Sequence, residues 1–517
     1  MFIERELDSI SAKADMDRLP SVIDSVIDAR TKLNEKLKIA VVGKTKAGKS
    51  TLLNSLLGIT KLPMGDGIVT GNVSVLMHTN ENPTKEETVV VHLTDKTTIK
   101  ITLEQYRELV DISKKDSLNI RDRIVWFDVY LKHQALLDMS IIDTPGDDSW
   151  LKYDSENAKK LFRDKNRKPD IIVYVVRKEF GSKDIEAAQD YLAQINGGEH
   201  RVSGLNVIAV YSCCDELVTS DIDGCNWDID YRVEGNRIIE NNRAKSSAFR
   251  KCFSKCFPVS AIFSMAANAI TESDLRILRE ISKSTLAEYF YRDFSYMEIA
   301  SMDYMGKELK DIFESESAKD DMLKRLGLDS MKYIVWWCMA NSSGTLATLK
   351  EELEKYSNVP ALRKYLLDEH YRKLSTFYKA TSVLSELKKN VEKQYIASVD
   401  IKTNDSLRSI LETCRNLEKK IYNQYGFLGV LRDYYDCLDY FDDTDWNLAY
   451  ETIMFCISSD GNKAEALNLY HQWKDKSLRV FVERNQGLKG MRLSMSPYRE
   501  QDWLANYPLY SVSAIFR

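Results

Sequence analysis

The chain has 517 residues, a formal net charge of −5 and a pI of about 5.9. This length allows two or three domains with sizeable cores, and the acidic balance argues against a nucleic-acid partner, which would require a basic face. The nine cysteines are scattered, the start at residues 1–7 is charged, and the apolar runs are far shorter than the roughly 20 residues that span a bilayer. These features predict a cytoplasmic protein without a signal peptide.

The first predicted elements are helices. Residues 5–37 are predicted to be helical, because apolar residues such as Val22, Val26 and Leu33 recur there at steps of three and four. A break is expected at Pro20, since proline lacks the backbone N–H that a helix interior needs.

A glycine-rich loop follows the apolar run 39–42, which predicts a buried strand, and precedes residues 51–57, which predict a helix. The loop has the pattern G-x-x-x-x-G-K-S in the strand–loop–helix context that a phosphate-binding loop requires. Its backbone N–H groups would surround phosphate, its lysine would contact the β- and γ-phosphates, and its serine could bind Mg²⁺. The predicted nucleotide-binding residues here are Gly43, Lys44, Thr45, Lys46, Ala47, Gly48, Lys49, Ser50 and Thr51.

A second apolar strand, predicted at residues 139–142, ends in Asp-Thr-Pro-Gly. Asp143 at its carboxyl edge could hold Mg²⁺ through water, and the N–H of Gly146 could turn toward a γ-phosphate. The alternative is a simple strand-ending turn, since Pro-Gly is favourable turn chemistry.

Residues 61–75, between these motifs, give the chain a resemblance to the dynamin-like GTPases, particularly their bacterial members. Those proteins carry a Leu-Pro-x-Gly segment, then a switch threonine and an alternating strand, and Thr70 occupies the position of the threonine. The resemblance implies GTP/GDP as the ligand and Mg²⁺ held by Ser50, Thr70 and Asp143, with a switch loop ordered before hydrolysis. The alternative is a glycine-rich surface loop that happens to contain a threonine.

The base-recognition segment departs from the family pattern. Such GTPases usually carry Asn/Thr-Lys-x-Asp after a buried strand, whereas here the apolar run 207–211 is followed by Ser212, Cys213, Cys214 and Asp215. Asp215 keeps the carboxylate that accepts hydrogen bonds from guanine, and Ser212 is a smaller substitute for Asn or Thr. Cys213 replaces the lysine whose stem covers the base, which predicts weaker nucleotide binding.

The last motif of the resemblance is the pair Ser260 and Ala261, which follows a short strand. In the family, backbone N–H groups of such a pair contact the guanine oxygen. With this pair, five motifs stand in the family's order, separated by predicted strands.

Lys46, Lys49 and Thr70 are the predicted catalytic residues. The resemblance implies that hydrolysis is promoted when two G domains meet, without an arginine supplied by an activator. The ammonium group of Lys46 could then neutralise charge between the β- and γ-phosphates. The alternative is that Lys46 merely faces solvent. The implied partners are a second copy of this chain, or a second dynamin-like chain, paired through the G domains.

The predicted fold is an α/β P-loop GTPase domain, a mostly parallel sheet with flanking helices, plus an extended α-helical bundle or stalk. Residues 1–37 are expected to pack on the bundle, and residues 38–367 to form the GTPase domain with a helical insertion near 263–350. Residues 368–517 are predicted to be the bundle or stalk and almost entirely helical, because apolar residues again recur at helical spacing.

Two segments could touch a membrane lipid surface. Residues 425–431 are apolar and interrupted by glycines, and residues 503–510 are aromatic. A buried helix–helix turn and a segment docked on the bundle are the simpler interpretations. The predicted location is therefore cytoplasmic, and peripheral at a membrane if either segment binds lipid.

The predicted function is Mg²⁺-dependent GTP hydrolysis in membrane remodelling or a membrane-associated process. One alternative is a nucleotide-gated scaffold or partner-binding subunit with little hydrolysis, which the change at Cys213 would favour. A second alternative, an Era-like RNA-associated GTPase, disagrees with the acidic composition.

Overall fold

The structure is a computed structural model with two compact units, Met1–Cys414 and Arg415–Arg517. It describes residues 2–44, 46–59, 62, 72–111, 118–144, 167, 169–177, 180–195, 207–219, 224–253, 255–313, 315–367, 369–398, 400–424, 490–494, 499–500 and 504–508. The predicted site residues Thr45, Thr70 and Gly146 and the candidate lipid-contacting segment 425–431 lie outside these residues.

A nine-stranded sheet forms the centre of the first unit. Its strands are β1 (Leu37–Gly43), β2 (Val73–His78), β3 (Thr88–Leu93), β4 (Thr98–Ile101), β5 (Ile124–Leu131), β6 (Met139–Asp143), β7 (Ile171–Arg177), β8 (Val207–Ser212) and β9 (Lys255–Pro258). Their order across the sheet is β4-β3-β5-β2-β6-β1-β7-β8-β9. Five of the eight pairings are parallel, which confirms the predicted mostly parallel α/β sheet.

Alternate residues of the central strands enter two separate hydrophobic cores. In β1, Ile39 and Val41 contribute to one core, whereas Ala40 and Val42 contribute to the other. This alternation follows from the two-residue period of a strand, and it explains why the central strands are apolar throughout: both faces are covered.

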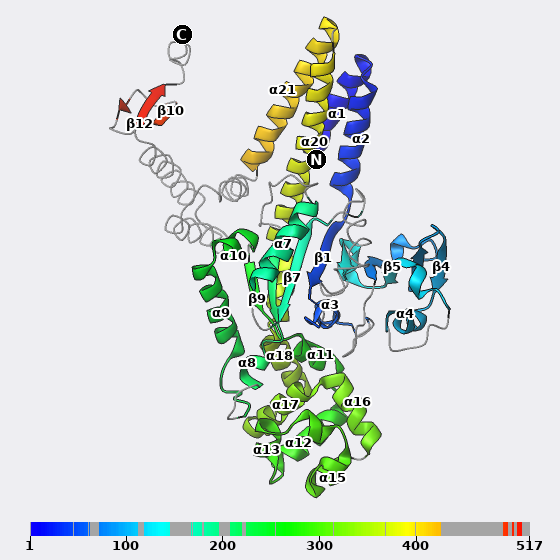
Figure 1. Cartoon of the computed structure of the whole chain (residues 1–517), viewed down its shortest axis with the longest axis vertical. Coiled ribbons are helices and arrows are strands. Elements are labelled where there is room, and N and C mark those ends of the chain that lie inside the picture. Colours follow the sequence, from blue (N-terminus) through cyan, green and yellow to red (C-terminus); the bar gives the residue numbers. More distant parts are fainter. Residues whose placement is uncertain are drawn as a thin grey trace. The chain divides into compact units, whose positions relative to one another are not determined.

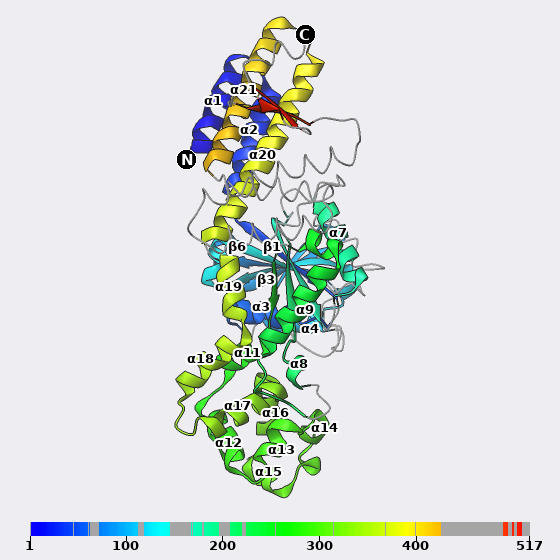
Figure 2. The same cartoon turned by 90° about the vertical axis from the view of Figure 1, so that its left-hand side faces the viewer.

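Helices cover both faces of the sheet, and α19 and α7 lie on opposite sides of it in Figure 2. One face carries α3 (Lys49–Leu57), α4 (Leu103–Val110) and α19 (Val359–Leu367). The other carries α7 (Ser182–Ile195), α9 (Tyr231–Lys245) and α10 (Ser247–Cys252), with the short α8 (Glu216–Thr219) following β8. Short 3₁₀ helices are η1 (Thr79–Glu81), η2 (Arg121–Arg123), η3 (Gln134–Leu137) and η5 (Met302–Tyr304).

In the described residues between β9 and α19, where the sequence predicts a helical insertion, the structure has eight helices. They are α11 (Ala261–Ala269), α12 (Glu272–Lys283), α13 (Ala287–Arg292), α14 (Tyr296–Ile299), α15 (Lys307–Ile312), α16 (Glu316–Leu326), α17 (Leu328–Ala340) and α18 (Leu346–Ser357). Several begin with a side-chain cap: the Thr271 hydroxyl accepts from the Asp274 N–H, and Ser295 and Thr345 start similar capping boxes. The dense apolar run 333–340 is part of α17, and Ile334 and Val335 there are fully buried.

The N-terminal helices α1 (Phe2–Met16) and α2 (Pro20–Asn34) lie beside α20 (Glu369–Ala397), as Figure 1 shows. Pro20 is the first residue of α2, where its missing N–H costs no helical hydrogen bond. Lys32 forms an ion pair with Glu386 of α20, and the Asn390 side-chain amide donates to the Ser25 hydroxyl at 3.3 Å. The next helix, α21 (Ile401–Gln424), begins in the first unit and ends in the second.

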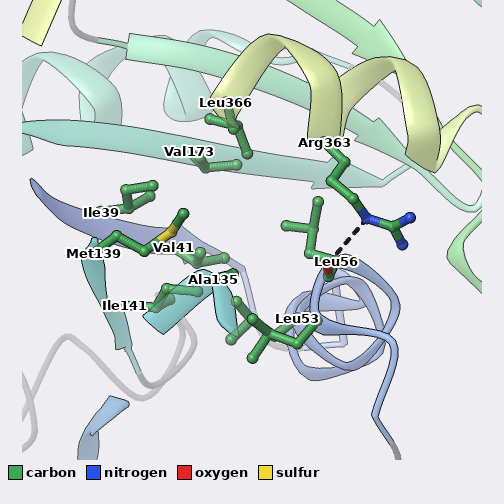
Figure 3. A pocket seen from close by; sticks show the side chains of 11 residues that line it. Ile39, Val41, Leu53, Leu56, Ala135, Met139, Ile141, Val173, Arg363 and Leu366 are labelled. Atoms are coloured by element: carbon green, nitrogen blue, oxygen red, sulfur yellow. Dashed lines mark hydrogen bonds between the residues drawn. The ribbon is translucent and has the colours of Figure 1, made fainter. Parts of the chain in front are cut away.

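Arg363 of α19 forms hydrogen bonds with the carboxyl end of α3. Its guanidinium donates to the carbonyls of Leu56 at 3.1 Å and Ser55 at 2.8 Å, among the last carbonyl groups of α3, which lack donors within the helix. Beside it lies a small apolar pocket between β1, α3 and α19 (Figure 3). The other residues lining that pocket are Ile39, Val41, Leu53, Leu56, Leu57, Ala135, Met139, Ile141, Val173 and Leu366.

Replacing Arg363 by methionine is expected to lower the free energy of unfolding by about 1–3 kcal/mol, because two buried helix-end carbonyls lose their charged donor. The matched control is Lys364→Met, at the exposed neighbouring position on the same helix, which should change it by less than about 0.5 kcal/mol. Urea denaturation of both variants measures the difference, and equal losses would contradict this role of Arg363.

The second unit contains the end of α21 and a small three-stranded sheet. In it β12 (Leu504–Pro508) pairs in parallel with β10 (Gly490–Ser494) and antiparallel with β11 (Arg499–Glu500). The prediction of an almost entirely helical tail is therefore wrong for these strands. Their residues alternate with a period of two, as in Met491 and Leu493 against Arg492 and Ser494, and this pattern fits a strand better than a helix. Among the described helices of the whole chain, none is both long and apolar enough to cross a membrane.

Candidate functional site

The glycine-rich loop connects the end of β1 to the start of α3, and its two glycines have backbone conformations that favour glycine. Gly43 has φ +143°, and a Cβ at that position would lie 2.2 Å from the carbonyl oxygen of Val175 in β7. Gly48, at φ +86°, is the residue from which α3 begins. The loop therefore brings backbone N–H groups and the amino end of α3 to one place, as anion binding requires.

Lys49 lies at the first position of α3 and is 6% exposed. Its ammonium group donates to the carbonyl oxygens of Gly43 at 2.8 Å and Lys44 at 2.9 Å. The side chain therefore curls back over the loop, which places its positive charge inside the ring of backbone groups. A phosphate oxygen entering the loop would meet this charge directly.

Three further contacts fix the shape of the loop from outside. The Ser212 hydroxyl, at the end of β8, lies 2.5 Å from the carbonyl oxygen of Ala47 and 3.1 Å from that of Val176. Arg177, at the end of β7, donates to the carbonyl of Lys46 at 3.2 Å. The Lys44 ammonium group pairs with the buried carboxylate of Asp184 in α7 at 2.9 Å. The side chain of Lys46 itself is exposed.

Asp143 ends β6 beside β1 and is 4% exposed. Burial raises its pKa to about 7, an effect that the positive charge of Lys49 partly offsets. Its Oδ1 atom is buried without a hydrogen-bond partner, whereas the hydroxyl of the next residue, Thr144, donates to the Val41 carbonyl at 2.9 Å. A buried, unsatisfied carboxylate oxygen at this edge, with the Ser50 hydroxyl in the first turn of α3, suits a water-coordinated Mg²⁺ ion.

Asp215 and Ser260 meet at the carboxyl ends of β8 and β9. The Ser260 hydroxyl donates to Asp215 Oδ1, and Asp215 is 5% exposed. The Ser260 N–H donates to the Ser357 carbonyl at 3.1 Å, and Ala261 is the first residue of α11. Cys213 has φ +54°, and its sulfur lies 3.7 Å from where a Cβ of Gly48 would be.

The helical segment adds a second carboxylate to this region, which the sequence analysis did not identify. Burial, together with the negative charge of Asp329 at the start of α17, raises the pKa of Asp215 to about 7, against the hydrogen bond from Ser260. Gly327, at φ +75°, turns the chain into α17 against Ile262, which its Cβ would approach to 2.9 Å. The packing of α17 beside the start of α11 thus places the charge of Asp329 where it acts on the Asp215 carboxyl.

The structure brings together most of the site residues that the sequence predicts, at one edge of the sheet. Those it does not describe are Thr45, Thr70 and Gly146. Arg177 and Asp184 were missed. The sequence signal for Arg177 is a charged residue at the end of the apolar strand 171–177, whereas its place beside the strand of the base-recognition motif is known only from the structure.

The arrangement defines a class of protein. A phosphate loop after β1, a carboxylate ending β6 and a base-recognition carboxylate after β8 all lie at the carboxyl ends of parallel strands, as in P-loop nucleotide-binding domains. Residues 39–194 match the family model described as "Dynamin family". This part of the chain is therefore similar to the GTPase domain of the dynamin family.

Individual relatives are distant. The chain is 23% identical over 363 residues to the isoniazid-induced protein IniC of Mycobacterium tuberculosis (strain CDC 1551 / Oshkosh), covering 70% of this chain and 68% of that protein. IniC of strain ATCC 25618 / H37Rv matches with the same values. One similar solved structure is described as an oligomerised bacterial dynamin pair that provides a mechanism for the long range sensing and tethering of membranes. It is 18% identical to this chain with a TM-score of 0.32, and the match covers 92% of this chain and 77% of that one.

Proposed function

We propose that this protein binds GTP with Mg²⁺ and hydrolyses it, that pairing of two G domains promotes hydrolysis, and that the resulting switch serves a membrane-associated process. The partner in this proposal is a second copy of the chain or a second dynamin-like chain. The observation that carries the proposal is the buried Lys49 ammonium group inside a loop shaped for phosphate, beside the unsatisfied oxygen of Asp143.

The roles of the residues follow from their places. Lys49 and the loop N–H groups would bind the β- and γ-phosphates, Ser50 and Asp143 would hold Mg²⁺, and Thr70 would complete that site. Mg²⁺ would neutralise charge on the phosphates when bound. Because the Lys46 side chain is exposed on the loop, it could stabilise charge that develops during hydrolysis once a facing G domain excludes water. Asp215, supported by Ser260, would accept hydrogen bonds from guanine.

A second candidate function is a nucleotide-gated scaffold that hydrolyses little. The observation that favours it is the short Cys213 side chain, which lies against Gly48 where the family carries a lysine over the base. Weak base contacts would make nucleotide occupancy depend on a partner.

The rate of hydrolysis per molecule, measured for GTP and ATP over a broad range of protein concentration, tests the proposal. A rate that is selective for GTP and rises with concentration supports hydrolysis coupled to G-domain pairing. A flat and negligible rate, together with measurable GTP binding, supports the scaffold. Absence of binding to either nucleotide rejects both.

GDP binding in metal-free buffer is expected to be about tenfold tighter at pH 8 than at pH 6. The carboxyl of Asp215, with a pKa of about 7 in the free protein, must be ionised to accept hydrogen bonds from guanine, so binding releases a proton and is favoured as the pH rises. The neighbouring charged groups, Asp329 and Glu216, both disfavour ionisation of the Asp215 carboxyl. When Mg²⁺ is omitted, no metal ion requires Asp143 to be ionised.

Calorimetry at both pH values measures this difference. The control is Asp215→Asn, which should bind GDP more weakly and with little dependence on pH. Equal or tighter binding of the wild-type protein at pH 6 would contradict the role of the Asp215 carboxylate.

A further inference from the structure

Cys213 stands where related GTPases carry the lysine that covers the base. Cys213 cannot replace that lysine, because its sulfur lies against the loop, 3.7 Å from the position of a Gly48 Cβ, and burial raises the pKa of the thiol to about 12. Position 213 therefore supplies neither the long stem nor the positive charge that the family places over one face of the base.

A cation from the neighbouring strand lies at the same edge. Arg177 is the last residue of β7 and is paired in register with Ser212, directly before Cys213. Its Nη1 donates to the Lys46 carbonyl of the phosphate loop at 3.2 Å, and its Nε donates to Glu216 at 3.0 Å, with a second contact from Nη2. Glu216 directly follows Asp215. The guanidinium thus bridges the phosphate loop and the base-recognition loop.

This geometry suits contact with a base. The Arg177 side chain is 40% exposed, so part of it remains accessible while Glu216 and the Lys46 carbonyl fix its direction. A guanidinium is planar and stacks on aromatic rings, and holding it in advance lowers the entropy lost when a ligand binds.

We propose that Arg177 performs the task of the missing lysine: its guanidinium, held by Glu216 and the Lys46 carbonyl, covers one face of the guanine ring in the bound nucleotide. The inference rests on the proposed function, since it names a further residue of the same site. Under this proposal the change at Cys213 does not remove the contact with the face of the base. Arg177, at the end of the neighbouring strand β7, makes that contact instead.

Binding of GDP and of inorganic tripolyphosphate to the full chain tests the proposal. Arg177→Ala should weaken GDP binding about tenfold, because a cation–ring contact is lost. Tripolyphosphate, which has no base, should lose at most about twofold in affinity: the Arg177–Lys46 contact is lost, but Lys49, Ser212 and the Lys44–Asp184 pair still shape the loop. Equal weakening for both ligands, or unchanged GDP binding, would overturn the proposal.

Two further variants sharpen the test. Cys213→Lys in the Arg177→Ala background restores the family's lysine and should recover most of the GDP affinity, which a purely structural role of Arg177 does not predict. Arg237→Ala is the matched control, since Arg237 is an exposed arginine paired with Glu234 on α9, away from the loop, and GDP binding should not change.

Failure of the proposed function and failure of the role of Arg177 give different binding results. If the wild-type chain binds neither GDP nor tripolyphosphate, the proposed function is rejected, and this inference with it. If the wild-type chain binds GDP and the Arg177→Ala protein, with unchanged circular dichroism, binds it equally well, only this inference is rejected.

Discussion

Replacing Lys49 by alanine is expected to lower GTP turnover by about a hundredfold or more, and to weaken GTP binding as well. The ammonium group is held inside the loop by the carbonyls of Gly43 and Lys44, at the place where the β- and γ-phosphates would lie. Preorganised charge of this kind is worth several kcal/mol in the transition state, because little reorganisation is needed when negative charge develops.

Turnover and nucleotide binding should be measured on the same preparation of Lys49→Ala, with circular dichroism to show that it is folded. Lys364→Ala, which removes an exposed lysine on α19, controls for the loss of one positive charge and should leave turnover unchanged. Undiminished hydrolysis by Lys49→Ala would reject the site itself.

Gly43→Ala is expected to have the largest effect on stability, lowering the free energy of unfolding by about 3–5 kcal/mol. The added Cβ would lie 2.2 Å from the Val175 carbonyl oxygen, a backbone atom in the neighbouring central strand that cannot rotate away. The backbone at φ +143° is also one that residues with a Cβ rarely adopt. Separation of β1 from β7 would move the phosphate loop that follows.

Gly58→Ala provides the matched control for this prediction. Gly58 also has a positive φ, +62°, but a Cβ there would meet nothing within 4 Å. Its substitution should therefore cost only the conformational strain, about 1–2 kcal/mol. Urea denaturation of the two variants separates strain from collision, and equal losses would show that contact with Val175 is not what requires glycine at position 43.

The sequence predicted the phosphate loop and the carboxylates because each motif is local. A loop such as 43–50 or a strand end such as Asp143 carries its chemistry within a few residues, and parallel strands bring such ends to one edge of a sheet. The α/β class was predictable for the same reason, since the central strands are apolar on both faces.

Features that depend on contacts between distant segments could not be predicted. Arg177 meets Lys46 and Glu216 only because β7 lies between β1 and β8, and no spacing in the sequence encodes that order. The charge of Asp329 acts on Asp215 only because of the packing of a helical segment that begins after Ser260. The strands β10–β12 were missed because short segments with weak alternation were outweighed by the helical pattern before them.

The contact between the first helices and α20 has a consequence for how the chain is made. Lys32 of α2 and its partner Glu386 are 354 residues apart, and Arg363 meets Leu56 across 307 residues. At roughly 5–20 residues per second, a ribosome needs roughly 20–70 s to extend the chain from α2 to the residues that cover it.

During that interval Val22 and Val26, which are almost fully buried in the folded protein, have no α20 to pack against. The core beside the sheet likewise lacks Val359 and Leu362 until α19 has been synthesised. Both apolar surfaces therefore stay uncovered until α19 and α20 have been synthesised, and α2 can pack on α20 only after that point.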